Sequence, residues 1–112
     1  MSTLGLRVGW AALRRLNSEL QTATYFAQTC ARDGIRLALS FDDLAVDDQG
    51  QHLLRFSDRE ADWTIELLPK TLELAASYRT LASEVERESL LEELRTADES
   101  QLLNIVRNGV AA

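Results

Sequence analysis

His52 is the only histidine and Cys30 the only cysteine in the chain, so these residues are the first candidates for nucleophilic chemistry. An imidazole activates a thiol or a serine hydroxyl only within hydrogen-bond reach, and no local signature joins His52 to such a partner. Cys30 falls on an apolar helical face, so we expect it to be buried and inert. His52 follows a turn, and we expect it to be structural or solvent exposed. We therefore predict no catalytic residue and no enzymatic activity.

Four aspartates at positions 42, 43, 47 and 48 could supply the carboxylate oxygens that hard cations prefer. Their spacing argues against a cation site. A calcium-binding loop alternates its ligands and ends on a glutamate, whereas the carboxylates of adjacent residues such as Asp47 and Asp48 point apart. Aspartate is common in turns because its side chain bonds to nearby backbone. We therefore predict neither a metal site nor a cofactor.

The remaining signatures of catalysis or phosphate binding are also missing. Glu66 is the carboxylate nearest to an apolar stretch, but strand alternation places it opposite the apolar residues around it, toward solvent. The glycines do not have the spacing of a phosphate-binding loop; they are Gly5, Gly9, Gly34, Gly50 and Gly109.

Acidic residues near the end of the chain form the strongest candidate for a binding surface. A solvated helical face explains them, and so does a docking surface for a basic protein partner. We place partner contacts on this face, at Glu84, Glu86, Glu88, Glu92, Glu93, Asp98 and Glu99.

Two neighbouring aromatic residues, Tyr25 and Phe26, add to the predicted partner surface. They cannot both lie on the buried stripe of one helix, so one of them is expected to be exposed. An exposed aromatic side chain beside polar residues suits an interface anchor, although packing under a sheet explains it equally well.

The elements that would carry these residues begin with a helical period. Apolar residues recur at steps of three, four or seven; they are Leu6, Trp10, Leu13, Leu20, Ala23, Ala27 and Ala31. Gly34 supplies a stop, since glycine readily adopts the left-handed conformation that ends helices. We predict one long helix over residues 6–33, in which Gly9 costs about 1 kcal/mol relative to alanine.

The period changes to two over residues 35–68, where turn-rich segments at 47–50 and 57–60 separate short apolar runs. Side chains on common strand faces include Ile35, Leu37, Leu39, Leu54, Phe56, Trp63, Ile65 and Leu67. We predict a β-meander of three to four antiparallel strands, which Pro69 ends just ahead of a helix.

A helical period returns over residues 71–108. It includes Leu74, Tyr78, Leu81 and Val85, at steps of four, three and four residues. Asp98 followed by Gln101 resembles a capping box that would open a last short helix. We predict two to three C-terminal helices and an α+β fold in one domain over residues 1–112. The open sheet edges make a homodimer an alternative to the monomer.

Composition narrows the function further. The chain has 112 residues and a formal net charge of −6, which disfavours direct contact with nucleic acid. No apolar run approaches a membrane-spanning length, the start of the chain lacks a secretory signal, and one cysteine excludes an internal disulfide. We expect a cytoplasmic protein.

These features favour a non-enzymatic small acidic protein that acts by protein–protein binding, as an adaptor, chaperone-like factor or inhibitor of a basic partner. The first alternative is a small enzyme or ligand-binding domain that uses His52. The second is a regulator of transcription or of a nucleic-acid-processing complex that acts through protein contacts.

Overall fold

The structure, a computed structural model, describes residues 2–110 of the chain. It contains helix α1 (Ser2–Arg15), strand β1 (Thr22–Tyr25), helix α2 (Ala31–Leu39) and strands β2 (Ala45–Val46), β3 (Leu53–Ser57) and β4 (Ala61–Leu67). Helix α3 (Pro69–Ser77), the 3-10 helix η1 (Tyr78–Thr80), helices α4 (Glu84–Thr96) and α5 (Glu99–Leu102), and strand β5 (Leu103–Val110) follow. The predicted α+β class is confirmed.

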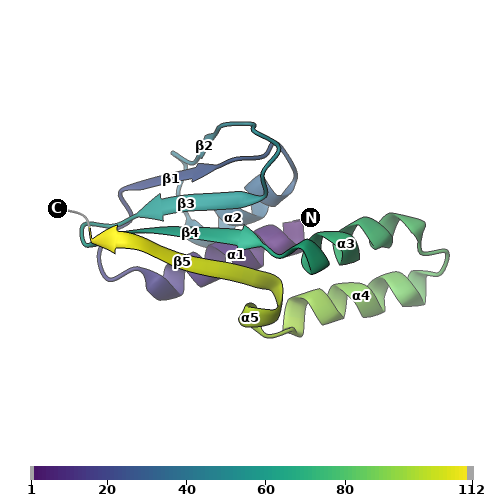
Figure 1. The fold of residues 1–112 in the computed structure, drawn as a ribbon. Coiled ribbons are helices and arrows are strands. Elements are labelled where there is room, and N and C mark those ends of the chain that lie inside the picture. The colour runs from purple at the N-terminus through teal and green to yellow at the C-terminus, as the bar shows by residue number, and fades with distance from the viewer. Residues whose placement is uncertain (1, 111–112) are drawn as a thin grey trace.

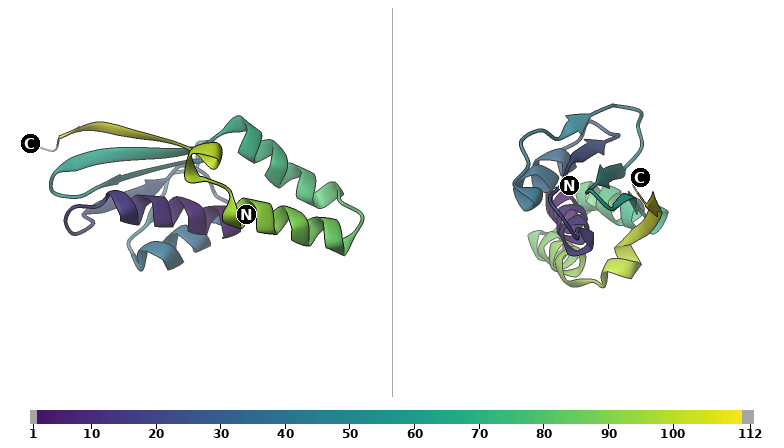
Figure 2. Two further views of the ribbon diagram at one scale, coloured as in Figure 1. Left: turned by 90° about the horizontal axis from the view of Figure 1, so that it is seen from below. Right: turned by 90° about the vertical axis from the view of Figure 1, so that its left-hand side faces the viewer.

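One sheet organises these elements (Figure 1). Its strand order is β2-β1-β3-β4-β5, and every neighbouring pair is antiparallel except β1 and β2, which are parallel. Helices α1 and α2 cover one face of the sheet, and α3 and α4 extend past its end as an arm (Figure 2). The molecule is therefore elongated, with extents of 50 × 25 × 23 Å.

Glycines set the close contact between α1 and α2. A Cβ added at Gly5 would lie 2.1 Å from the carbonyl oxygen of Ala31, and one at Gly9 would lie 2.5 Å from the Cβ of Ala38. Such distances are far shorter than any van der Waals contact, so only glycine lets the two helices approach this closely. The cost of glycine inside α1 is thus offset by helix packing.

The predicted helix over residues 6–33 is wrong, because the chain breaks after Arg15 and forms β1 before α2 begins. In β1, Ala23 and Tyr25 are buried, and the threonine between them is half-buried. Apolar residues at 23, 27 and 31 fit a helical spacing equally well, so the local pattern was ambiguous. Pairing of β1 with β2 and β3 decides in favour of the strand.

The predicted strand around residues 35–39 is also wrong, since these residues belong to α2. Ile35 and Leu39 are buried four residues apart, whereas Leu37 is 73% exposed. A strand would have placed Leu37 on the same face as the other two. Gly34, expected to stop a helix, lies buried inside α2.

The hairpin of the predicted meander is confirmed in β3 and β4. Leu54 and Phe56 face the core from β3, and Ile65 and Leu67 face it from β4. Leu54 pairs with Ile65 in the register, so apolar side chains on the same face meet across the two strands. The strong alternation of these two segments made them predictable.

The C-terminal region differs from the prediction of helices over 71–108. Pro69 opens α3 as expected, and the Ser83 hydroxyl accepts a hydrogen bond from the Glu86 amide at the start of α4. Asp98, however, makes no side-chain cap, and α5 ends at Leu102. The chain then forms the edge strand β5, which pairs with β4 and places Leu103 beside Leu67.

Candidate functional site

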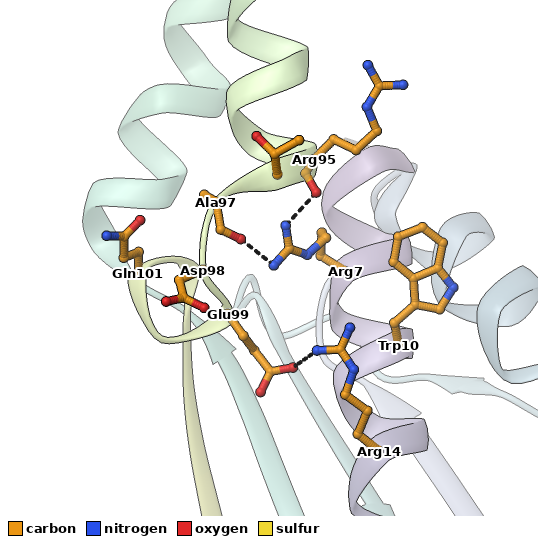
Figure 3. Close-up of a pocket in the computed structure, with 9 residues that line it drawn as sticks. Arg7, Trp10, Arg14, Arg95, Ala97, Asp98, Glu99 and Gln101 are labelled. Atoms are coloured by element: carbon orange, nitrogen blue, oxygen red, sulfur yellow. Dashed lines mark hydrogen bonds and ion pairs between the residues drawn. The ribbon is translucent and has the colours of Figure 1, made fainter.

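A cavity of about 600 Å³ lies where α1 meets the segment between α4 and α5 (Figure 3). Its wall is formed on one side by α1 and on the other by the end of α4 and the start of α5. The lining residues are Arg7, Trp10, Arg14, Arg95, Thr96, Ala97, Asp98, Glu99 and Gln101. Three of these nine carry a guanidinium group, in a protein that is acidic as a whole.

Arg7 forms the floor of the cavity and is only 8% exposed. Its Nη1 donates to the carbonyl oxygens of Leu94 at 3.1 Å and Arg95 at 2.7 Å, and its Nη2 donates to that of Ala97. These oxygens lie at the C-terminal end of α4, where the last carbonyls have no partner within the helix and carry its negative partial charge. Arg7 therefore fixes the end of α4 against α1.

Glu99, the first residue of α5, is held by two consecutive arginines of α1. Its carboxylate accepts a hydrogen bond from Arg14 Nη1 at 2.7 Å and another from Arg15 Nη2. The Glu99 side chain is 17% exposed, whereas that of Arg14 is 61% exposed. The Arg14 guanidinium thus bonds to Glu99 on one side and faces solvent at the mouth of the cavity on the other.

Sequence analysis missed Arg7 and Arg14 as members of a site, and it assigned Trp10 to a buried helical stripe. Trp10 is instead 39% exposed and lines the cavity (Figure 3). Nothing in the local sequence signals this arrangement, because its two walls are more than eighty residues apart along the chain. Contact between α1 and α4 alone brings them together.

Most of the acidic residues predicted to bind a partner lie on α4 and face solvent. Glu84, Glu86, Glu88, Glu92, Glu93 and Asp98 are exposed, and Glu92 pairs with Arg95 on the same helix. Glu99 is different, since it is half-buried and already paired with two arginines. The structure thus does not bring all seven carboxylates to one open surface.

Of the two aromatic candidates, Tyr25 is fully buried and Phe26 is partly exposed. Burial raises the pKa of the Tyr25 hydroxyl, and the Thr29 hydroxyl partly offsets this effect. Its Oη lies 3.4 Å from Nδ1 of His52. Tyr25 therefore belongs to the interior and cannot offer its ring to a partner, whereas Phe26 can.

His52 and Cys30 open on one cavity, of about 770 Å³, which also involves α3 and η1. Cys30 stands at the N-cap of α2 and is exposed, so the expectation of a buried thiol is wrong. It was based on a continuous helix that does not form. In the described part of the chain no hydrogen bond links the Cys30 thiol to the imidazole, and the two do not form a nucleophile–base pair.

The aspartates considered as cation ligands act in turns. Asp47 accepts a hydrogen bond from the Gln49 side chain, and Asp48 accepts one from the Gly50 amide. Within residues 2–110 no three histidine, cysteine, aspartate or glutamate side chains gather into a potential metal site. The helices described here also include none with the length and apolar character needed to cross a bilayer.

Comparison with known proteins yields one family and one similar structure. The family model described as "FmdE, Molybdenum formylmethanofuran dehydrogenase operon" matches residues 1–108. The crystal structure of an FmdE-like protein from Syntrophus aciditrophicus, described as a tungsten formylmethanofuran dehydrogenase subunit, superimposes with a TM-score of 0.61 at 15% identity. The match covers 97% of the present chain and 64% of that protein. No curated protein matches significantly.

These matches correct the function expected from sequence. The prediction of a free acidic adaptor, chaperone-like factor or inhibitor, together with its two alternatives, is wrong. The matched family is described by a dehydrogenase operon, and the similar structure by a component of such an enzyme. Composition could not reveal this, because net charge and an empty motif list are shared by many unrelated proteins.

Proposed function

The chain belongs to the FmdE family, and from this membership we propose that it works as a subunit of a formylmethanofuran dehydrogenase-type enzyme complex. The observation that carries the proposal is the family match, which extends over residues 1–108 and so over nearly every described element. We place the complex in the cytoplasm.

The molybdenum or tungsten named for these relatives does not fit the side chains of this chain. Residues 2–110 offer no cluster of three metal-ligating side chains, and the single cysteine supplies one thiolate at most. Soft metals of this kind prefer several sulfur ligands. In the proposed complex the metal is therefore held by another subunit, and the present chain contributes through protein contacts.

We place the partner contact on the exposed face of α4. This helix belongs to the arm that projects past the sheet, where a partner can reach it without disturbing the core (Figure 1). Glu88 and Glu93 are exposed there. Their charge makes a patch with basic side chains the complementary surface on the partner subunit, and such complementarity speeds association and selects the partner.

The test is purification of the tagged chain from its own cells at native expression. We expect a second protein to co-purify in fixed stoichiometry on gel filtration, and we expect molybdenum or tungsten to co-elute by elemental mass spectrometry. Elution of the chain without that metal would overturn the assignment to such a complex.

Charge reversal tests where the partner binds. Glu88→Lys together with Glu93→Lys should weaken the complex by about tenfold or more, measured by the amount of partner retained. Asp42→Lys with Asp43→Lys is the matched control, because these exposed residues lie before β2, away from α4. Equal retention by both double variants would move the contact away from α4 while leaving membership of the complex intact.

A further inference from the structure

We propose that the cavity between α1 and the α4–α5 segment binds a small planar anion, namely an aromatic or heteroaromatic ring that carries a phosphate or carboxylate group. This site goes beyond the proposed function and does not depend on it. The proposal rests on the charge of the cavity floor, the exposed indole and the position of the arginines.

Arg7 gives the cavity a buried positive charge. In the described part of the chain the Arg7 guanidinium forms no ion pair with a carboxylate, and its hydrogen bonds go to three backbone carbonyl oxygens. Carbonyl oxygens satisfy donors but carry no full negative charge. An anion in the cavity would gain from this positive charge, which interacts more strongly at partial burial than in bulk water.

Arg14 and Arg95 add two mobile cations at the mouth. Their side chains are each 61% exposed, and each has one carboxylate partner, Glu99 for Arg14 and Glu92 for Arg95. Glu99 is also paired with Arg15, so the positive charges around this carboxylate outnumber it. A guanidinium has five N–H donors, and one partner leaves donors free for a ligand's oxyanion.

Trp10 supplies a surface for a ring. Its side chain is 39% exposed and lies between Arg7 and Arg14 on the α1 wall of the cavity (Figure 3). Indole is the best aromatic platform for stacking, and a neighbouring arginine can hold the charged end of the same ligand. Asp98 is the opposing charge, and it stands beside Gln101 on the other wall (Figure 3).

The size of the cavity suits a small molecule. Its volume of about 600 Å³ falls within the range of roughly 300–1,000 Å³ that ligand pockets occupy. The combination of one exposed indole with three arginines predicts that neither a ring alone nor an anion alone satisfies the site. This joint requirement is the measurable signature of the proposal.

Four probes separate these contributions by titration calorimetry with the purified full chain. Adenosine 5′-monophosphate and naphthalene-2-carboxylate carry a ring with an oxyanion, adenosine carries the ring alone, and inorganic phosphate carries the charge alone. We expect at least one of the first two to bind with a Kd at or below about 1 mM, and adenosine and phosphate to bind about tenfold more weakly. Which of the two binds better identifies phosphate or carboxylate as the preferred group.

Variants give the sign of the charge that the site recognises. Arg14→Gln and Arg95→Gln should each weaken binding by about three- to tenfold, whereas Asp98→Asn should strengthen it by about two- to fivefold. Trp10→Ala should weaken it by about tenfold. Arg59→Gln, an exposed arginine in the β3–β4 turn, removes the same charge elsewhere and should leave binding unchanged.

The proposal would be overturned by any of three results. These are no saturable binding of either ring anion at 10 mM, equal affinity for adenosine, or weaker binding by Asp98→Asn. Circular dichroism of each variant shows whether it is folded, and the exposed positions chosen keep the core intact. Because no partner subunit is present in these measurements, failure here leaves the proposed complex untouched, and failure of the complex leaves this site untouched.

Discussion

Asp58 shows how one side chain can hold two distant turns. The residue is 3% exposed, and its carboxylate accepts hydrogen bonds from the backbone amides of Asn17, Glu60 and Ala61 at 2.9, 2.7 and 2.9 Å. These bonds connect the loop after α1 to the β3–β4 turn. They lower the pKa of the Asp58 carboxyl to about 2, because amide donors favour the charged form.

Asp58 therefore makes stability depend on pH in a defined direction. The folded-state pKa lies below the unfolded value of 3.8, so the contribution is complete above about pH 5 and is lost as pH falls from about 4 to 2. Asp58→Asn should lower the urea midpoint at pH 7, and the difference from the parent should shrink toward pH 2. Asp43→Asn, at an exposed turn position, is the control. A gap for Asp58→Asn that stays constant down to pH 2 would contradict this assignment.

At the scale of elements, the pair α1 and α2 depends on backbone contact that only glycine permits. Without a close neighbour, replacing a helical glycine by alanine stabilises a protein by about 1 kcal/mol. At Gly5 the nearest atom is a backbone oxygen, which cannot move away alone. At Gly9 the nearest atom is the Ala38 side chain, which can be removed.

This difference gives an element-level prediction. Gly5→Ala should lower the free energy of unfolding by about 1–3 kcal/mol, the usual cost of overpacking, instead of raising it. Gly9→Ala should also destabilise, but combining it with Ala38→Gly should recover part of the loss. Chemical denaturation measures each variant. A stabilising Gly5→Ala would show that α1 and α2 do not pack this closely.

On the scale of the whole molecule, the last strand closes a structure that began at the first helix. Strand β5 covers the edge of β4, and the Thr71 hydroxyl donates to the carbonyl oxygen of Leu102 at 2.8 Å. Arg7 ties the end of α4 to α1, while α4 also lies against α1 (Figure 2). The cavity and the arm both depend on these long-range contacts.

Truncation tests this dependence. A chain that ends at residue 98 keeps every helix of the arm but loses α5 and β5, and with them Leu102, Leu103 and the Glu99 ion pairs. We expect it to lose cooperative unfolding, because buried core side chains and a row of sheet hydrogen bonds disappear together. Thermal melts of the full chain and a chain ending at residue 110 provide the comparison. A cooperative melt of the shorter chain at the same temperature would refute the idea.

The sequence alone determined the elements whose local pattern allows one reading. The β3–β4 hairpin follows from two-residue alternation on both sides of a turn, and α3 begins at the only proline because its ring suits the first helical turn. The exposure of the glutamates on α4 follows from their charge. These features depend on neighbours along the chain and need no distant partner.

Tertiary structure decided the rest, because the same spacing of apolar residues fits two elements. Ala23, Ala27 and Ala31 suit a helix, yet β1 forms because β3 offers it a pairing edge. Residues 102–106 suit a helix too, and β4 draws them into β5. The arginine-lined cavity arises only once α1 and the end of α4 are in contact, so neither sequence segment could announce it by itself.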